Sequence, residues 1–332
     1  MSGARNLVLR ALTTASISRI VGRWSKPQGT VFYFHRFASS QGTLLGHKTA
    51  YLRSALESLR AANIDLVNVD DLVERASSRV GARRPTVAFS IDDGYRDFVD
   101  EALPVFEAYD CPTTLYVVPG VIDGECWFWW DQLEWIVRHA DPAHETLSIT
   151  IGAESFPLTA GHSELSRQRL ATAGEALKRA SDTDLRAAIM ACASAARLAL
   201  PQTAPANCAV STWEALREVT RRGVRIGAHT MSHPILSRCE DAHAEFEIRR
   251  SKQRVAEEIA NPSLVFCYPN GSRRDFGARD MTMVREAGFV AAVSTDPGHV
   301  SNSGIPDTLR WRLPRYANEE RHGATSRAVL LP

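Results

Sequence analysis

Short apolar runs rich in β-branched and aromatic residues alternate with stretches of helical spacing along most of this 332-residue chain. The strand-like runs occupy residues 30–34, 86–89, 113–118, 224–227, 264–266 and 290–293. Helical spacing of apolar residues predicts helices at 51–62, 70–75, 102–109, 212–221, 241–259 and 281–287. Strands that alternate with helices pair in parallel and connect by right-handed crossovers. The sequence therefore predicts an α/β fold built on a parallel sheet, either open or closed into a barrel.

Residues 139–208 depart from this alternation. Two short β-like runs predict a small hairpin, and two Ala- and Leu-rich stretches predict helices, at 147–151, 156–158, 163–178 and 182–200. Nothing in this stretch carries obvious chemistry, so we interpret it as an inserted helical subdomain that shapes substrate access. We divide the chain into an N-terminal segment, residues 1–28, and one domain, residues 29–332, with the insertion at about 139–208.

The composition excludes several classes of protein. With 44% hydrophobic and 23% charged residues the chain can bury a sizeable core, and a net charge of +1 gives no overall attraction to nucleic acid. The six cysteines are widely spaced without a CxxC pair, which is typical of free thiols in a reducing compartment. The sequence has no run of about 18 apolar residues that would predict a membrane-spanning helix. We therefore expect a cytoplasmic protein.

The N-terminal segment is basic and contains no acidic residue before Glu57. Its apolar residues Ile17, Ile20, Val21 and Trp24 have the spacing of one helix face. A secretory signal needs an uninterrupted apolar stretch, which Arg10 and Arg19 break. We favour a helix packed on the domain. The alternatives are an organelle transit peptide and a peripheral contact of residues 1–26 with the inner face of a membrane.

Two adjacent carboxylates, Asp92 and Asp93, end the strand-like run at 86–89 and precede Gly94. Past such an Asp-Gly corner, both side chains can turn toward one cleft. Two like charges this close are costly unless a cation or a proton separates them. The pair therefore predicts a cation or a shared proton at the end of this strand, although an isolated Asp-Asp-Gly is usually a solvated turn.

His229 and His233 follow another strand-like run, at residues 224–227. On a helical turn their spacing would place both imidazoles on one side. With one carboxylate they would form a two-His, one-Asp metal set that leaves positions open for water and substrate. The second carboxylate would stay off the metal, free to take a proton from water. The alternative is two histidines that happen to flank a turn.

Aromatic residues cluster at Trp127, Phe128, Trp129, Trp130 and Trp135. Aromatic faces suit the apolar faces of sugar rings, so this cluster predicts either a sugar-stacking wall or a core under a loop. We expect Trp135, which lies in a helical stretch, to be core.

These motifs together resemble those of the polysaccharide deacetylase family, carbohydrate esterase family 4, which has the NodB-homology fold. Residues 90–95 resemble its (T/S)FDDGY motif, and residues 229–234 match H(S/T)xxHP in full. Three further stretches, 31–36, 266–271 and 313–315, are similar to its YHR start, its FAYPxG variant and its late LPR. The resemblance covers roughly residues 29–316 outside the insertion, and it implies a distorted (β/α) barrel.

The resemblance also implies roles for individual residues. Asp92 would be the general base. Asp93, His229 and His233 would hold zinc or a similar divalent metal such as cobalt, nickel or manganese. The Asn270 N–H would lie beside the developing oxyanion. The aromatic residues that we assign to substrate binding are Tyr95, Trp129, Trp130 and Tyr268.

This chain departs from the family pattern at two points. Cys267 stands where many members have an arginine that holds the base, and we expect Arg315 to reach Asp92 instead. The late Leu-x-His motif that supplies the general acid is missing from the sequence. His35 and His299 are the candidates, and we favour His35 near the pocket without assigning it a proton.

The sequence thus predicts a metal-dependent hydrolase that removes an N-acetyl or similar acyl group from an amino sugar or glycan precursor, which a nucleotide or a lipid could carry. An O-acetyl esterase or a deformylase would use the same site. A non-catalytic carbohydrate-binding module is a further alternative, although a metal-only site has no need of Asp92. A two-His, one-carboxylate iron oxygenase shares the ligand set but usually has an antiparallel β framework. The sequence contains no GxSxG, GxxxxGK, GxGxxG or zinc-finger spacing.

Overall fold

A computed structural model describes residues 28–38, 46–78, 84–142, 147–301 and 304–317. Within these ranges the main sheet has seven strands, in the order β10-β1-β3-β4-β7, with β11 on β1 and β2 on β3. The strands are β1 (Gln28–Phe34), β2 (Asp65–Val67), β3 (Thr86–Ile91), β4 (Thr113–Val117), β7 (Val224–Ala228), β10 (Val300–Ser301) and β11 (Tyr316–Ala317). All ladders are parallel except that of β1 with β10. The predicted α/β architecture is confirmed.

Two further strands, β8 (Val265–Cys267) and β9 (Ala291–Val293), form a separate parallel pair. The Ser263 N–H donates to the Ile226 carbonyl at 2.7 Å and so ties this pair to β7. On its other side Leu313 bridges to Val293 in parallel. The arc of strands is therefore interrupted, as expected for a distorted barrel.

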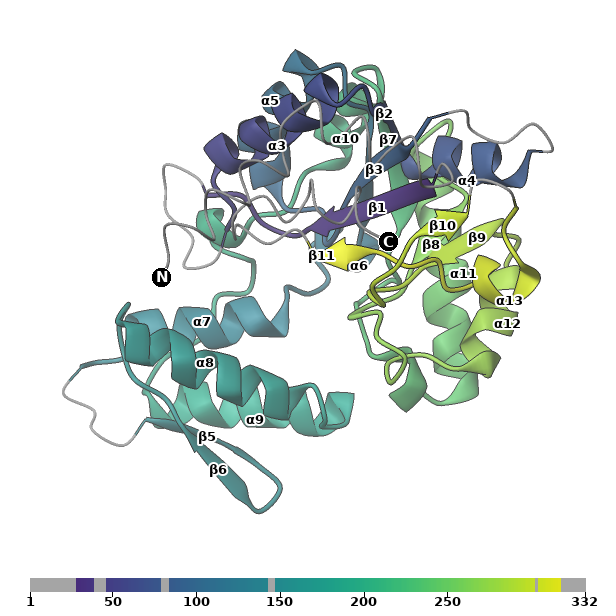
Figure 1. The fold of residues 1–332 in the computed structure, drawn as a ribbon. Coiled ribbons are helices and arrows are strands. Elements are labelled where there is room, and N and C mark those ends of the chain that lie inside the picture. Colours follow the sequence, from purple (N-terminus) through teal and green to yellow (C-terminus); the bar gives the residue numbers. More distant parts are fainter. Residues whose placement is uncertain (1–27, 39–45, 79–83, 143–146, 302–303, 318–332) are drawn as a thin grey trace, which may run out of the picture.

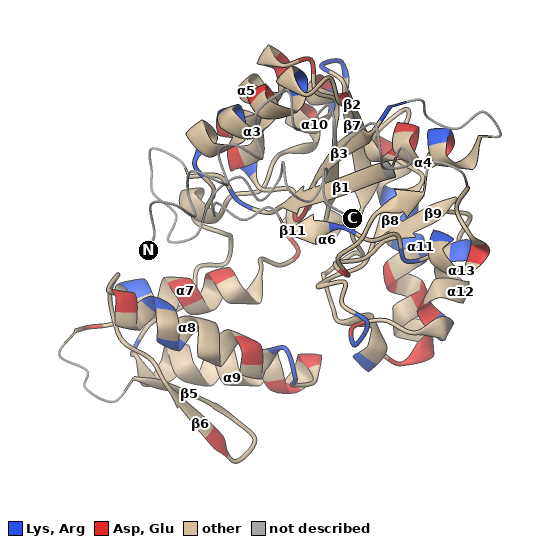
Figure 2. Ribbon diagram, viewed as in Figure 1, with Lys and Arg blue, Asp and Glu red and all other residues tan. Residues whose placement is uncertain are grey.

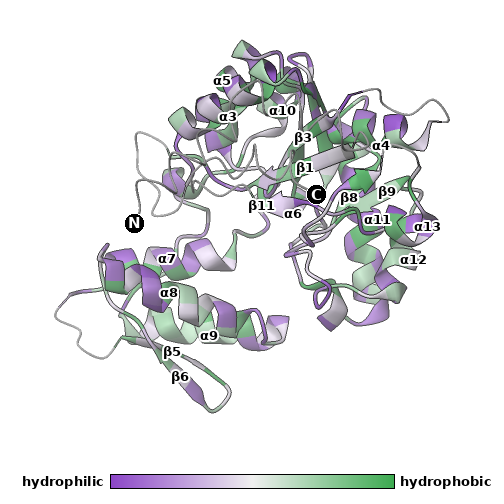
Figure 3. Cartoon of the chain, in the orientation of Figure 1, coloured by the Kyte–Doolittle hydropathy of each residue, from purple (hydrophilic) through white to green (hydrophobic). Residues whose placement is uncertain are grey.

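Helices cover the outside of these strands (Figure 1). They are α3 (Thr49–Ala61), α4 (Val69–Ser77), α5 (Leu103–Ala108), α6 (Pro119–Ile122), α10 (Trp213–Thr220), α11 (Asp241–Glu258), α12 (Ala278–Glu286) and α13 (Asp307–Arg310). A π-helical turn at Phe98–Ala102 precedes α5. Side-chain caps fix two of the starts: Asn68 accepts from the Asp71 N–H, and Thr212 accepts from the Ala215 N–H. Hydrophobic residues concentrate on the central strands and on the helix faces turned toward them (Figure 3).

A helical layer lies below the barrel in Figure 1. It contains α7 (Trp129–His139), α8 (Glu164–Leu177), α9 (Asp182–Ala195) and the hairpin β5 (Ser148–Ile151) and β6 (Glu154–Pro157). These elements share their own core, against which Trp135 is half-buried. The predicted hairpin and helices are confirmed, but α9 ends earlier than predicted, where Arg197 adopts a positive φ of 57°. Because α7 belongs to this core, the layer begins before residue 139, and the division into domains stays a prediction.

The predicted N-terminal helix falls on residues 1–27, which lie outside the described ranges, and Gln28 already belongs to β1. The helix and its membrane contact therefore stay predictions. None of the helices in the described ranges combines the length and the hydrophobicity needed to span a bilayer. Acidic and basic residues are interspersed over the helices (Figure 2).

Candidate active site

The chain turns sharply at the end of β3, where Asp92 and Asp93 lie. The Asp92 N–H still donates to the Phe34 carbonyl at 2.9 Å, so Asp92 continues the ladder with β1. Asp93 and Gly94 then both adopt positive φ, 75° and 79°. A Cβ on Gly94 would lie 3.1 Å from the Val117 side chain, so both the backbone and the neighbouring strand favour glycine here. This turn directs the two carboxylates to different neighbours.

His229 and His233 lie on an irregular loop after β7. The expectation of a helical turn is wrong: Thr230 and His233 both have a φ of 63°, outside the helical region. The Thr230 hydroxyl accepts from the His233 N–H at 3.1 Å and closes the loop. The two rings nevertheless meet, with centroids 4.8 Å apart. The predicted juxtaposition is therefore present, but it depends on left-handed residues rather than on helical spacing.

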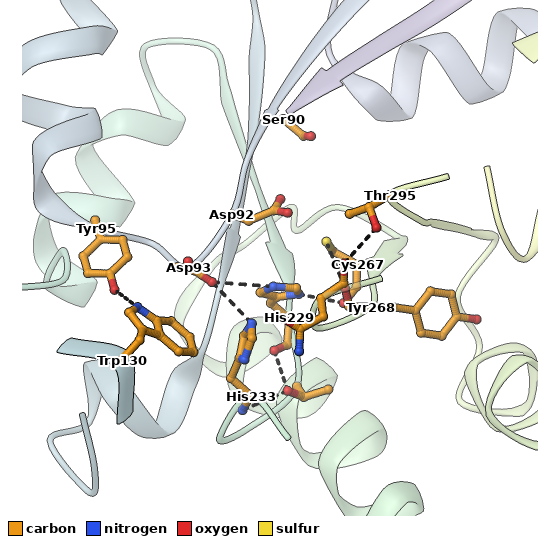
Figure 4. Close-up of polar contacts among 12 residues, drawn as sticks. Ser90, Asp92, Asp93, Tyr95, Trp130, His229, His233, Cys267, Tyr268 and Thr295 are labelled. Carbon is orange, nitrogen blue, oxygen red and sulfur yellow. Dashed lines mark hydrogen bonds and ion pairs between the residues drawn. The ribbon is translucent and has the colours of Figure 1, made fainter. Parts of the chain in front are cut away.

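Asp93 faces both imidazoles (Figure 4). Its Oδ1 lies 3.6 Å from His229 Nε2 and 3.5 Å from His233 Nε2. His229 Nδ1 lies 2.8 Å from the Cys267 carbonyl, to which it must donate, so its Nε2 presents a lone pair toward Asp93. Asp93 Oδ1 is buried and has no hydrogen-bond partner among the described residues. Asp93 Oδ1 and His229 Nε2 therefore face each other at 3.6 Å without a hydrogen bond between them.

The pKa values of this trio fit the same interpretation. Burial lowers the pKa of His229 to about 4 and that of His233 well below its usual value, so both imidazoles are neutral near pH 7. Burial, with Asp92 and Asp131 nearby, raises the pKa of Asp93 well above its usual range. A divalent cation would relieve this cost, because it binds neutral imidazole and ionised carboxylate. The three residues therefore fit a metal chemically.

Asp92, by contrast, has a full partner. Arg315 is fully buried, and its Nη1 lies 2.8 Å from Asp92 Oδ1. The same guanidinium donates to the Ser294 carbonyl and to the Ser90 hydroxyl, at 2.8 and 2.9 Å. Burial alone would raise the pKa of Asp92, but Arg315, together with the nearby His229 and His35, holds that pKa at about 2. The predicted contact between Arg315 and Asp92 is confirmed.

A second group of ligand types, Asp92, His229 and Cys267, also lies close together. Burial raises the pKa of the Cys267 thiol well above its usual value. Because a thiol must lose its proton to bind a metal, and because Arg315 already neutralises Asp92, this group is the weaker candidate.

Asn270 follows β8 in a left-handed conformation, with a φ of 56°. Its carbonyl accepts from the Thr295 hydroxyl at 2.8 Å, which fixes the loop. Within the described residues its N–H donates to no other group. An unused donor at the rim of the site is what the predicted oxyanion contact needs, and that role stays a prediction.

Two cavities open beside the trio. One has a volume of about 510 Å³ and is lined by His35, Asp93, His233 and Asn270, with Trp129 and Trp130. The other, about 410 Å³, shares both tryptophans, His233 and Asn270. His35 is exposed and meets Tyr33 edge-on. The second histidine that sequence reasoning offered, His299, lines neither cavity and contacts Thr30 instead.

The four aromatic residues assigned to substrate binding differ in position. Trp129 and Trp130 are half-buried and line both cavities. Tyr95 borders one cavity but is 1% exposed, and its hydroxyl accepts from Trp130 Nε1 at 2.6 Å and donates to Asp131 at 2.7 Å. It therefore positions Trp130.

The assignment of Tyr268 is corrected. Its ring turns away from the histidines in Figure 4 and stacks on Phe276, with centroids 3.8 Å apart. Its hydroxyl donates to the Trp311 carbonyl, and the residue lines neither cavity. Tyr268 is a core residue, because the left-handed turn that follows β8 directs only Asn270 to the site.

Sequence reasoning missed Glu247 of α11. This buried carboxylate accepts from the Met231 and Ser232 N–H groups at 2.7 and 2.9 Å, and from the Ser232 hydroxyl at 2.7 Å. It therefore holds the loop between the two histidines. The available signal was periodicity, since Glu247 shares the buried face of α11 with Ala244, Ile248 and Val255.

Comparisons with known proteins agree with this geometry. The family model described as polysaccharide deacetylase matches residues 182–291, which include both histidines but not Asp92. No curated protein sequence matches the chain significantly. The resemblance to this family, predicted from the motifs, is confirmed.

Solved structures show the fold. The Streptococcus pyogenes deacetylase PplD in complex with acetate has a TM-score of 0.60 at 13% identity and covers 93% of this chain and 100% of its own. IcaB from Ammonifex degensii has a TM-score of 0.57 at 13% identity, and the match covers 93% of this chain and 99% of IcaB. A de-N-acetylase from Aggregatibacter actinomycetemcomitans has a TM-score of 0.55 at 14% identity, and the match covers 92% of this chain and 100% of that one. At these identities the likeness establishes the NodB-type barrel.

Proposed function

We propose that this chain, which resembles the polysaccharide deacetylases in its motifs, in residues 182–291 and in its fold, removes an N-acetyl or similar acyl group from an amino sugar or glycan precursor. One observation carries the proposal. A buried carboxylate, Asp93, faces two neutral imidazoles at 3.5–3.6 Å while its neighbour Asp92 is separately paired with Arg315. A non-catalytic module has no use for that second, ionised carboxylate.

Asp93, His229 and His233 would hold the divalent metal. We propose zinc, with cobalt, nickel and manganese as the alternatives that this ligand set also accepts. When bound there, the metal supplies a Lewis acid for the acyl carbonyl and lowers the pKa of water.

The chain's own residues supply the remaining steps. Asp92, kept ionised and oriented by Arg315, accepts the proton of the attacking water. The Asn270 N–H donates to the oxyanion that develops on the acyl oxygen. His35 borders the same cavity, and we propose it as a catalytic residue without a specified proton.

Trp129 and Trp130 would contact the sugar. Both line the cavity that contains Asp93, and Trp130 is held by stacking on Phe128, with centroids 4.4 Å apart, and by its bond to Tyr95. A wall fixed in this way can orient a pyranose ring over the acyl-transfer groups. The six free cysteines support a proposed cytoplasmic location.

Acetate release from N-acetylated amino sugars, free and linked to a nucleotide or a lipid, tests the proposal. We expect release that a chelator abolishes, that added zinc restores, and that Asp92→Asn loses while it retains metal. Binding of the sugars without release would favour the carbohydrate-binding module. Release from O-acetyl or N-formyl sugars alone would favour the esterase or the deformylase.

A further inference from the structure

The larger cavity reaches from the metal trio to the helical layer. On that side it is bordered by what we call the apolar wall: Leu133 of α7 and Leu170, Ala171 and Gly174 of α8. On the other side lie Asp93, His233 and Asn270. A volume of about 510 Å³ is in the range of sites that hold drug-sized ligands and leaves room beyond an acetamido group. A group attached to the sugar would therefore meet the apolar wall.

The apolar wall is aliphatic and has no side-chain donors or acceptors. The charged residues at its edge already have partners: Lys178 pairs with Glu175 at 2.7 Å, Arg167 pairs with Glu164, and Glu134 pairs with Arg138. Further along the lining, Arg36 pairs with Asp97 at 2.6 Å. A second sugar residue would bring hydroxyls to this surface, which offers them few free partners. An anionic group would have to compete with carboxylates for each cation.

Two small residues keep the space open. Ala171 and Gly174 lie one turn apart on the same side of α8, so larger residues there would project into the cavity. A Cβ on Gly174 would lie 4.0 Å from the Trp129 ring, at ordinary contact distance. Gly174 has no positive φ, so the backbone does not require glycine. A larger side chain at position 174 is therefore compatible with the backbone, and it tests directly whether a ligand uses this part of the cavity.

We propose that the apolar wall binds a hydrocarbon aglycone, so that the substrate is an amphiphile in which an acylated amino sugar carries an alkyl or acyl chain. This inference rests on the proposed function for its sugar end. Burial of methylene groups against the half-buried Leu170 and the exposed Ala171 would stabilise binding, and each buried methylene adds a few-fold in affinity.

Acetate release is measured with the methyl and octyl β-glycosides of N-acetylglucosamine, the latter below its micelle concentration, and with its β-1,4-linked tetramer. We expect kcat/KM to be about tenfold or more higher for the octyl than for the methyl glycoside. Gly174→Leu and, independently, Ala171→Leu should each reduce the octyl-to-methyl ratio to about threefold or less. The matched control is Thr172→Leu, since Thr172 is exposed on α8 and lines neither cavity.

Equal kcat/KM for the two glycosides, or a preference for the tetramer that both leucine variants retain, would overturn the inference. If no glycoside releases acetate, the proposed function fails instead. Binding to Asp92→Asn, followed by calorimetry, then decides the inference alone. Tighter binding of the octyl glycoside that Gly174→Leu weakens supports the apolar wall, and equal affinities for both glycosides reject it.

Discussion

Two carboxylates that are neighbours in the chain have opposite surroundings. Asp92 lies 2.8 Å from a fully buried guanidinium, and its pKa is about 2. Asp93 faces two imidazoles at 3.5–3.6 Å, and burial raises its pKa well above the usual range. The difference arises because the left-handed turn at Asp93 and Gly94 separates the two side chains. Under the proposed function these adjacent aspartates take different tasks: Asp92 accepts a proton, and Asp93 binds a cation.

The largest effect is expected at Asp93, where a substitution tests whether this carboxylate binds the metal. Asp93→Ala should reduce zinc affinity by at least about 100-fold, because it removes one of the three ligands that the described residues offer the proposed metal. Acetate release should fall to the background rate. Asp92→Asn, the matched variant, should lose about 10²–10⁴-fold in kcat yet bind zinc as before. Titration with a zinc indicator and acetate release distinguish the two. Equal loss of zinc in both variants would contradict the separation of roles.

Substitution of Arg315 should have a smaller effect on turnover, and this effect should depend on pH. Arg315→Met removes the charge that holds the pKa of Asp92 low, so burial and the neighbouring Asp93 should raise it. Less of the proposed base is then ionised at neutral pH, so turnover should fall about 10–100-fold and recover as pH rises through the new pKa. Arg315→Lys, which retains a charge, should lie between Met and the parent.

Metal content and thermal unfolding serve as controls for Arg315→Met, since an unpaired buried carboxylate also destabilises the fold by about 3–5 kcal/mol. A pH-rate profile whose acidic limb stays where it is in the parent would refute the role of Arg315.

Much of this arrangement was predictable from the sequence. The carboxyl ends of parallel strands meet at one edge of a sheet, so motifs after residues 86–89 and 224–227 had to converge. The departure at Cys267 pointed to Arg315, and the contact is present. The strands β2, β10 and β11 were missed because runs of two or three residues carry no periodicity.

Other features depended on backbone conformations that residue types do not reveal. Thr230, His233 and Asn270 are non-glycine residues with positive φ, and each reorients the side chain or N–H that defines the site. Periodicity places Glu247 on the buried face of α11, but the sequence does not show that its carboxylate holds the loop between the two histidines. The prediction for Tyr268 was wrong for the same reason, because the sequence does not show that its ring packs in the core before the chain turns at Asn270.

Substitution of Glu247 tests how far metal binding depends on the loop that carries His229 and His233. Glu247→Gln removes the charge from the acceptor of the Met231 and Ser232 N–H groups and places an amide NH2 opposite the Ser232 hydroxyl. We expect zinc affinity to fall about 10-fold and the free energy of unfolding to fall by about 1–3 kcal/mol. The matched control is Glu245→Gln on the same helix, where Glu245 pairs with Arg249 at the surface. Zinc titration of the folded variants decides, and unchanged affinity would mean that the histidines hold their positions alone.

The smallest effect concerns Asp131, a third buried carboxylate that can be compared with Asp92 and Asp93. Asp131 also faces a guanidinium, but Arg36 Nη1 is 3.7 Å away and Arg36 pairs closely with Asp97. Burial therefore prevails and raises the pKa of Asp131 to about 7, although Arg36 and the Tyr95 hydroxyl lower it. Since the folded state holds this proton up to about pH 7 and the unfolded chain releases it near pH 4, Asp131 makes the protein less stable as pH rises between those values.

Tyr95→Phe removes a hydrogen bond that favours the ionised form of Asp131. Its cost should therefore grow with pH, from a few tenths of a kcal/mol near pH 5 to about 1 kcal/mol near pH 8. Zinc affinity should not change, because Tyr95 contacts none of the three ligands, whereas KM for the sugar should rise a few-fold as Trp130 loses its partner. Denaturant unfolding at both pH values measures the first effect. A pH-independent cost would show that the Tyr95 hydroxyl does not distinguish the two protonation states of Asp131. The difference between the pKa of Asp131 and that of Asp92 would then depend on the distance to the guanidinium and not on Tyr95.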